Sequence, residues 1–151
     1  MEKEFRISAG AIVINEDKVL LVRYLDSHGK SYLVGPGGGA FINENANQAV
    51  IREVKEETNL DVSPGKVLFV EDLLSKRHRI TKIWFLCSLT GGKLAKTQGA
   101  LDEEIIEVGW YRRDQLKNEI VYPSILSGHS WDAFFKNNWI TLYAELQKVD
   151  F

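Results

Sequence analysis

The chain has 151 residues, a mass of 17.2 kDa, 44% hydrophobic and 26% charged residues, and a formal net charge of -2. This length suits one globular domain, and the composition excludes a disordered or collagen-like chain. The balanced charge argues against long nucleic acid as a partner, because binding by phosphate neutralisation needs a basic field.

The cysteine content and the N-terminal sequence bear on the compartment. The single cysteine, Cys87, lies in an apolar run, so we expect a reduced and buried thiol. One cysteine cannot form a disulfide within the chain, which favours a cytoplasmic location. The N-terminus is charged, and no apolar stretch long enough for a signal peptide or a membrane span follows it, so no membrane partner is expected.

The N-terminal part has the pattern of short strands separated by polar breaks. Residues 5–14 and 19–24 are apolar and β-branched on either side of a polar tetrapeptide, which predicts a hairpin. Another strand is expected over residues 31–34. The glycine-rich residues 35–39 come directly after it and predict a special loop.

A helix is expected next, because the apolar period changes from that of a strand to that of a helix. It runs from Ala46 to about Thr58. Asn45 can cap its start with Gln48 as the reciprocal partner, and Asn59 suits the left-handed conformation that often ends a helix. The sequence therefore marks both ends.

The C-terminal part continues the mixed pattern. Further strands are expected over residues 66–74, beyond a Pro-Gly pair, and over residues 79–89 and 104–111, with a short helix over residues 113–118. Residues 130–135 and 139–146 predict a helix followed by either a strand or a second helix, and periodicity leaves both open. These elements indicate one mixed α/β domain without internal repeats.

Three glutamates on the predicted helix are the first signal of chemistry. Glu53, Glu56 and Glu57 are spaced i, i+3 and i+4, so their carboxylates are expected on one face within reach of a common point. Three carboxylates repel one another unless cations occupy the cluster, and Mg²⁺ or Mn²⁺ suits oxygen-rich sites that also hold phosphates. The alternative is a solvated acidic helix face.

Residues 38–60 resemble the Nudix box, the family pattern G-x5-E-x7-R-E-U-x-E-E-x-G-U in which U is aliphatic. The matching residues are Gly38, Glu44, Arg52, Glu53, Val54, Glu56, Glu57 and Leu60. Asn59 stands where the family has glycine, and asparagine is the next-best residue for a left-handed helix end. Residues 76–80, followed by Trp84 and Phe85, look like the MutT-type members of this family.

The resemblance to Nudix hydrolases implies an α/β fold in which a mixed β-sheet is sandwiched between helices (α/β/α), as one domain over residues 1–151. It implies hydrolysis of the pyrophosphate bond of a nucleoside diphosphate linked to another moiety. The leading substrate is a nucleoside triphosphate, ordinary or oxidised, which would give a nucleoside monophosphate and pyrophosphate. The markers of two other subgroups, a proline near Ser75 and a tyrosine near Arg77, are missing.

Two other functions stay open beside this one. The first is cleavage of ADP-ribose or another nucleoside diphosphate conjugate. The second is a non-catalytic sensor of the same fold that binds a nucleotide without cleaving it. In each case the partner is a small nucleotide, and a homodimer is neither indicated nor excluded.

The resemblance also implies a metal site. Glu53, Glu56 and Glu57 would bind Mg²⁺ (or Mn²⁺), and the backbone of Gly38 would approach the metal because no side chain obstructs it. The metal would polarise phosphorus and activate the attacking water. Glu53 is both a metal ligand and a candidate catalytic residue.

Further catalytic residues are carried over from the family in the same way. Arg52 would pair with neighbouring carboxylates such as Glu44 or Glu56 and hold them in register. In the acidic stretch before the strand at 104–111, Glu104 is the first candidate for a general base or an additional metal ligand, and Glu103 is the second. The alternative there is an exposed acidic loop.

Basic and aromatic residues are candidates for substrate contacts. Arg23, Arg77 and Arg79 could neutralise substrate phosphates, although a solvated hairpin tip would look the same. The candidates to stack on a base, each of which could equally be a core residue, are Tyr24, Phe41, Trp110 and Tyr111.

A dinucleotide-binding reading of the glycines is disfavoured. Residues 35–40 formally match G-x-G-x-x-A. That fingerprint needs a helix that opens at the glycines, whereas the capping residues here place the start of the helix near Asn45.

Overall fold

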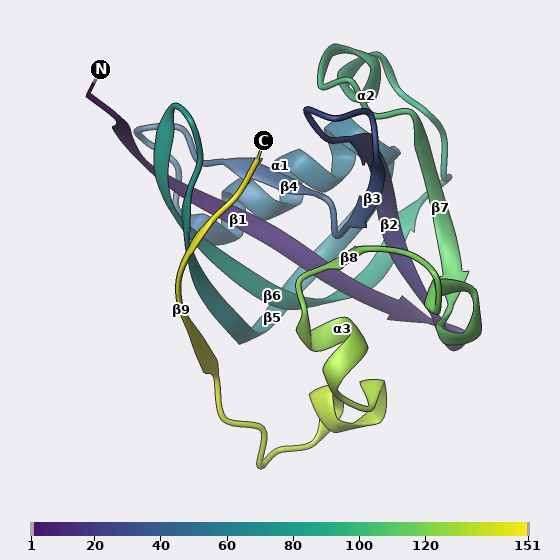
Figure 1. Cartoon of the computed structure of the whole chain (residues 1–151). Helices are drawn as coiled ribbons and strands as arrows, with labels where there is room; N and C mark the ends of the chain where they lie inside the picture. The colour runs from purple at the N-terminus through teal and green to yellow at the C-terminus, as the bar shows by residue number, and fades with distance from the viewer. Residues whose placement is uncertain (1, 151) are drawn as a thin grey trace.

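The computed structural model describes residues 2–150, which form a curled mixed β-sheet with a few helices (Figure 1). The strands are β1 (Glu4–Asn15), β2 (Lys18–Leu25), β3 (Ser31–Val34), β4 (Gly37–Gly39), β5 (Leu60–Leu74), β6 (His78–Gly92), β7 (Glu107–Arg112), β8 (Val121–Tyr122) and β9 (Leu142–Lys148). The helices are α1 (Ala46–Thr58), α2 (Gln98–Asp102) and α3 (Ile125–Gly128), with 3₁₀ turns η1 (Arg113–Leu116) and η2 (Trp131–Phe135).

The order of strands in the sheet is β8-β3-β2-β1-β6-β5-β9, with β4 paired to β1 and β7 to β2. The predicted hairpin is confirmed, since β1 and β2 pair antiparallel with Ile14 opposite Val19. The rest of β1 leaves β2 and runs parallel to β6, as Figure 1 shows. This switch of partners lets β1 belong to both halves of the curled sheet.

Helices cover both faces of the sheet, so the predicted α/β fold with a sandwiched mixed sheet is confirmed. On one face, Val50 and Val54 of α1 pack in a buried cluster with Ala11 of β1. On the other face, Leu126 of α3 packs in a second buried cluster with Trp84 of β6. In residues 2–150, no helix is long and apolar enough to cross a membrane.

The predicted helix is confirmed at both ends. In α1, the Asn45 side chain accepts a hydrogen bond from the Gln48 backbone N–H at 2.8 Å, and the Gln48 side chain accepts one from the Asn45 N–H at 2.9 Å. Asn59 ends the helix with φ of 66°. These local caps fix where the helix that carries the box glutamates begins and ends.

Two strand predictions need correction. β5 begins at Leu60 and carries Pro64 within it, and the pairing register shifts between Pro64 and Val67 because proline cannot donate to the ladder. Glu104 was expected to open a strand, but β7 begins at Glu107. Glu104 instead lies in a turn with φ of 62°, in which its N–H bonds to the carbonyl of Leu101 in α2.

The open question at the C-terminus has a definite answer. Residues 131–135 form the 3₁₀ turn η2, and the segment after it ends in a strand, because β9 pairs parallel with β5 from Phe69–Leu142 to Leu74–Lys148. This strand extends the sheet beyond β5. Figure 1 shows it returning toward the end of the sheet that carries β4.

The glycine-rich segment is a strand on its own rather than only a loop. β4 pairs antiparallel with β1, with Gly37 opposite Gly10. A Cβ on Gly37 would lie 2.3 Å from the Ala9 carbonyl oxygen, so this backbone can approach β1 only without a side chain. The close approach places β4 against the side of α1 that carries Glu53 and Glu57.

Candidate active site

Glu53 and Glu57 form a buried acidic pair between α1 and the glycine strand β4. Their exposed fractions are 8% and 1%. The Gly37 N–H donates a hydrogen bond to Glu57 Oε1 at 3.3 Å. A Cβ on Gly38 would lie 2.7 Å from the Glu53 carboxylate, so glycine leaves room for this carboxylate against the backbone.

The surroundings of this pair disfavour negative charge. Burial raises the pKa of Glu57 well above its usual range, and the neighbouring Glu53 charge raises it further. Burial also raises the pKa of Glu53, although Glu57 and the adjacent Arg52 act in the opposite direction. A bound cation would relieve the repulsion, which makes the pair chemically suited to hold one.

Arg52 organises the acidic residues around the pair. Its guanidinium donates to Glu44 at 2.8 and 2.9 Å, to Glu53 at 3.0 Å and to Glu56 at 3.2 Å, and it also donates to the Gly39 carbonyl at 3.0 Å. This contact lowers the pKa of Glu44 to about 2. One arginine therefore fixes α1, β4 and the loop between them in a single arrangement.

Only two of the three box glutamates meet at a common buried point. The side chain of Glu56 is about half exposed and faces Arg52, whereas Glu53 and Glu57 share a buried hydrogen-bonded site. Within residues 2–150, no three acidic, histidine or cysteine side chains are arranged as a ready metal cluster. The donors that fit a hard divalent cation are thus two buried carboxylates beside a glycine backbone, with Glu56 within one helical turn.

A cavity of about 600 Å³ adjoins this site. Gly38 of β4 forms part of its wall. Its polar and charged lining includes Arg6, Glu71, Lys76, Lys82, Glu103 and Glu104. Its aromatic lining is Tyr24, Tyr32, Trp84 and Tyr122, and Tyr24 stacks on Tyr32 with ring centroids 5.7 Å apart. The volume is that of a typical small-ligand pocket.

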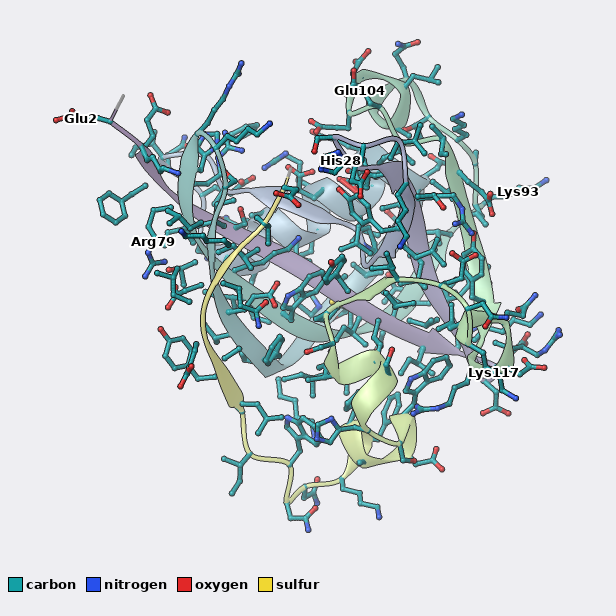
Figure 2. The ribbon with its side chains drawn as sticks, viewed as in Figure 1. Glu2, His28, Arg79, Lys93, Glu104 and Lys117 are labelled. Carbon is teal, nitrogen blue, oxygen red and sulfur yellow. The ribbon has the colours of Figure 1, made fainter. Side chains whose placement is uncertain are left out.

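Glu103 and Glu104 lie at the cavity from the side of α2. Both are exposed, and both line the cavity that Gly38 also lines. Figure 2 shows Glu104 beside α2, at the same end of the molecule as His28. The structure thus brings the predicted acidic segment to the same cavity as Gly38 of the box.

The NUDIX domain model matches residues 4–128, which is most of the chain. The chain belongs to the NUDIX family. This family generally uses divalent metal ions, and the Nudix box of this chain supplies Arg52, Glu53 and the other acidic residues described above.

Relatives of this Nudix domain carry several names. It is 37% identical over 119 residues to the mouse (Mus musculus) protein named 8-oxo-dGDP phosphatase NUDT18, covering 77% of this chain and 35% of that protein. It is 33% identical over 101 residues to an 8-oxo-dGTP diphosphatase of Proteus vulgaris, covering 66% and 89%. The chain spans about a third of the length of the first of these relatives.

The fold is also shared with solved structures. A crystal structure of an ADP-ribose pyrophosphatase from Streptococcus suis matches with a TM-score of 0.64 at 24% identity, covering 92% of this chain and 98% of that one. At this identity the likeness concerns the fold alone. It covers the C-terminal part beyond residue 128 more fully than the family model does.

The three arginines expected at substrate phosphates lie elsewhere in this Nudix domain. Arg23 donates to both carboxylate oxygens of Glu119 at 3.0 Å, and Arg79 donates to Asp72 at 2.9 Å. Arg77 is exposed in the turn between β5 and β6. None of the three lines the cavity described above, and Figure 2 shows Arg79 at the outer side of the molecule.

The aromatic candidates also divide between core and site. Tyr24 lines the cavity, whereas Trp110 and Tyr111 pack against the two buried clusters. Phe41 is exposed, and the Arg52 guanidinium lies 3.8 Å from its ring centroid. Only Tyr24 of the four is therefore in place to contact a bound base.

Sequence reasoning missed two charged lining residues, Glu71 of β5 and Lys82 of β6. Each stands within a predicted strand, and no known motif surrounds its charge. The available signal was the charge itself, since a lysine or glutamate inside a buried strand needs a partner or a function.

Proposed function

We propose that this Nudix domain is a divalent-metal-dependent pyrophosphohydrolase of small nucleotides, with residues 38–60 as its catalytic centre. The preferred substrate in this proposal is a nucleoside triphosphate, ordinary or oxidised, which yields a nucleoside monophosphate and pyrophosphate. The observation that carries it is the buried Glu53–Glu57 pair beside the β4 backbone, at a cavity of about 600 Å³.

The acidic pair would hold the cation. Glu53 and Glu57 supply carboxylate oxygens, and Glu56 completes the set when its side chain leaves Arg52. When bound, Mg²⁺ or Mn²⁺ supplies Lewis-acid polarisation of a phosphoryl oxygen and lowers the pKa of a water molecule. Arg52 keeps the other carboxylates in register through its hydrogen bonds to Glu44, Glu53 and the Gly39 carbonyl.

A general base comes from one of two places in this proposal. Glu104, with Glu103 as the second choice, lines the cavity and has a side chain that is exposed to solvent, where an attacking water would stand. Glu53 is the alternative, because burial raises its pKa and so makes it a stronger base than an ordinary carboxylate. The two options are distinguished by whether the single variant Glu104→Gln, or Glu103→Gln, loses turnover.

The names of the relatives support a purine nucleotide substrate. The mouse protein is named an 8-oxo-dGDP phosphatase and the Proteus protein an 8-oxo-dGTP diphosphatase. The cavity accommodates a nucleoside and is lined by aromatic rings on which a base can stack. A cytoplasmic location, expected from the single buried thiol of Cys87, belongs to the same proposal.

A substrate panel tests the proposal. The purified chain is incubated with nucleoside triphosphates, 8-oxo-dGTP, nucleoside diphosphates and ADP-ribose, each with Mg²⁺ or Mn²⁺ and with chelator, and products are resolved by chromatography. We expect a nucleoside monophosphate and pyrophosphate from triphosphates, and no turnover with chelator. If only ADP-ribose is hydrolysed, ADP-ribose takes the place of nucleoside triphosphates as the proposed substrate. Tight nucleotide binding without any hydrolysis would support the non-catalytic sensor instead.

A further inference from the structure

Three polar side chains share one wall of the cavity. Glu71 of β5 and Lys82 of β6 are direct cross-strand partners, so their side chains leave the sheet on the same face. Trp84 lies two residues along β6 and therefore on that face as well. All three line the cavity.

Glu71 and Trp84 are buried and Lys82 is partly buried, yet no hydrogen bond of acceptable geometry joins any two of them. Glu71 is 7% exposed and Trp84 is fully buried. Trp84 Nε1 faces the Glu71 carboxylate without a hydrogen bond of acceptable geometry, and it is the one buried side-chain N or O atom in the described part of the chain that lacks a partner. Such groups are nearly always paired in folded proteins, which makes this one a candidate for a ligand contact.

Lys82 is similarly uncommitted. Its Nζ lies 4.3 Å from the centre of the Trp84 ring, and no direct hydrogen bond or ion pair joins it to a carboxylate within residues 2–150. Burial lowers the pKa of Lys82, and the charges of Glu71, Glu57 and Glu53 act in the opposite direction. The wall thus offers an ammonium donor and a carboxylate acceptor on neighbouring strands, both at the cavity and not joined by a hydrogen bond or ion pair.

Building on the proposed function, we propose that Lys82 and Glu71 read the Watson–Crick edge of the substrate base and select guanine. That edge presents an acceptor (O6) followed by two donors (N1–H and N2–H). An ammonium next to a carboxylate presents a donor followed by two acceptors, which is the complementary order. Lys82 would donate to O6, and the two oxygens of Glu71 would accept from N1–H and N2–H.

The other bases fit this order less well. Adenine offers one donor and one acceptor on the same edge and leaves one carboxylate oxygen without a partner. Uracil and thymine place a carbonyl oxygen against the carboxylate, which is repulsive, and cytosine offers a single donor group. An unsatisfied buried polar group costs about 1–3 kcal/mol, or roughly 5- to 150-fold in affinity.

The aromatic lining of the cavity suits the face of the same base. Tyr24 and Tyr32, from β2 and β3, are stacked with an interplanar angle of 20°. Stacking on aromatic side chains combined with hydrogen bonds to the Watson–Crick edge is how many proteins hold a single base. The pair Lys82 and Glu71 does not reach C8 in this pose, so guanine and 8-oxoguanine satisfy it equally.

The test compares Glu71→Gln with a matched control, Glu145→Gln, which makes the same chemical change at an exposed position of β9. Steady-state kcat/KM is measured for dGTP, 8-oxo-dGTP and dATP. We expect the wild type to prefer both guanine substrates over dATP by about tenfold or more, and Glu71→Gln to lose about tenfold on the guanine substrates but under threefold on dATP. The control should match the wild type. An equal loss on all three substrates in Glu71→Gln, or no loss, would overturn the proposal.

Lys82→Gln supplies a second variant with its own discriminating result. Because Lys82 also feels the charges of Glu53 and Glu57, it could contact a phosphate instead of the base. A larger loss on dGTP than on dATP supports base reading, whereas an equal loss on both assigns Lys82 to the phosphates and overturns its part of the proposal.

Calorimetry with dGMP and dAMP on metal-free protein separates this inference from the proposed function. Preferential binding of dGMP, reduced in Glu71→Gln, supports the base site even if no substrate is hydrolysed. Hydrolysis of triphosphates without any preference for guanine, in turnover or in binding, would leave the proposed function standing and remove the base site.

Discussion

The Asp72 carboxylate on β5 accepts a hydrogen bond from the Tyr143 hydroxyl on β9, across 71 residues of sequence. The same carboxylate accepts from Arg79 at 2.9 Å and from Thr81 at 2.6 Å, both on β6. Asp72 is only 4% exposed. One buried acid therefore fastens three strands at the outer part of the sheet, including the strand that the family model does not cover.

Asp72→Asn should destabilise the fold by about 2–3 kcal/mol, since hydrogen bonds to a charged acceptor are stronger than neutral ones. Arg79 and Tyr143 hold the pKa of this carboxyl down to about 2, from an ordinary value of 3.8. The unfolded chain therefore binds more protons between these values, so this stabilisation is present above pH 3.8 and is lost as the pH falls toward 2. Urea unfolding from pH 2 to 5 should show a smaller pH dependence in Asp72→Asn, and an unchanged slope would contradict the assignment.

Glu57→Gln and Glu53→Gln should each lower kcat by about 100-fold or more, because a bound metal contributes several kcal/mol to the transition state. The metal-free Glu57→Gln variant should melt at a higher temperature than the metal-free wild type, since burial and the neighbouring Glu53 disfavour the ionised form of Glu57. Glu16→Gln, in the exposed turn between β1 and β2, is the control. Wild-type turnover in either box variant would exclude these residues as metal ligands.

Gly38→Ala tests the contact between β4 and the acidic pair. The added methyl group would lie 2.7 Å from the Glu53 carboxylate, which is the free end of a flexible side chain and can move aside. The variant should therefore fold but lose about tenfold or more in kcat, because the carboxylate leaves its position. Gly91→Ala, whose new methyl group would meet Asp61 at 3.5 Å, should keep its activity. Equal activity in both variants would show that the Glu53 position is not critical.

Glu104→Gln should lower kcat by about 100-fold while substrate binding stays within a few-fold, if this residue acts in the transition state. Glu103→Gln is measured in parallel, because both residues line the cavity. Asp102→Asn, whose carboxylate accepts from Gln98 within α2, is the control. Wild-type rates in both glutamate variants would assign the base to Glu53 instead.

Cys87 should resist alkylation by iodoacetamide at pH 8 in the native protein. The thiol is buried, and burial raises its pKa to about 12, so the reactive thiolate is scarce. Labelling followed by mass spectrometry should show modification only after addition of urea. Rapid labelling of the native protein would mean that β6 opens locally around this residue.

The parts of the fold and the site that the sequence predicted are those set by neighbouring residues. Asn45, Gln48 and Asn59 mark the ends of α1 because capping is a contact within four residues. The pairing of Arg52 with Glu44 was expected from the box and is present at 2.8 Å. Local spacing was sufficient in both cases.

The parts that could not be predicted depend on partners distant in sequence. Arg23 meets Glu119, 96 residues away, so a guanidinium expected at phosphates is neutralised by a carboxylate that no local pattern announces. Lys82 and Glu71 become neighbours only through the register of β5 on β6. The β4 strand likewise depends on pairing with β1, which a run of glycines does not reveal.

The strand β9 and the residue that follows it form part of the cavity wall. Its residue Gln147 and the following Val149 line the cavity, and the Val149 N–H bonds to the Leu74 carbonyl at 3.1 Å. The acidic pair and its glycine strand lie within residues 4–128, whereas this part of the wall lies outside them. One part of the cavity wall therefore lies outside the stretch that carries the acidic pair, so exchanging the C-terminal tail between homologues would change this part of the wall while Glu53 and Glu57 are kept.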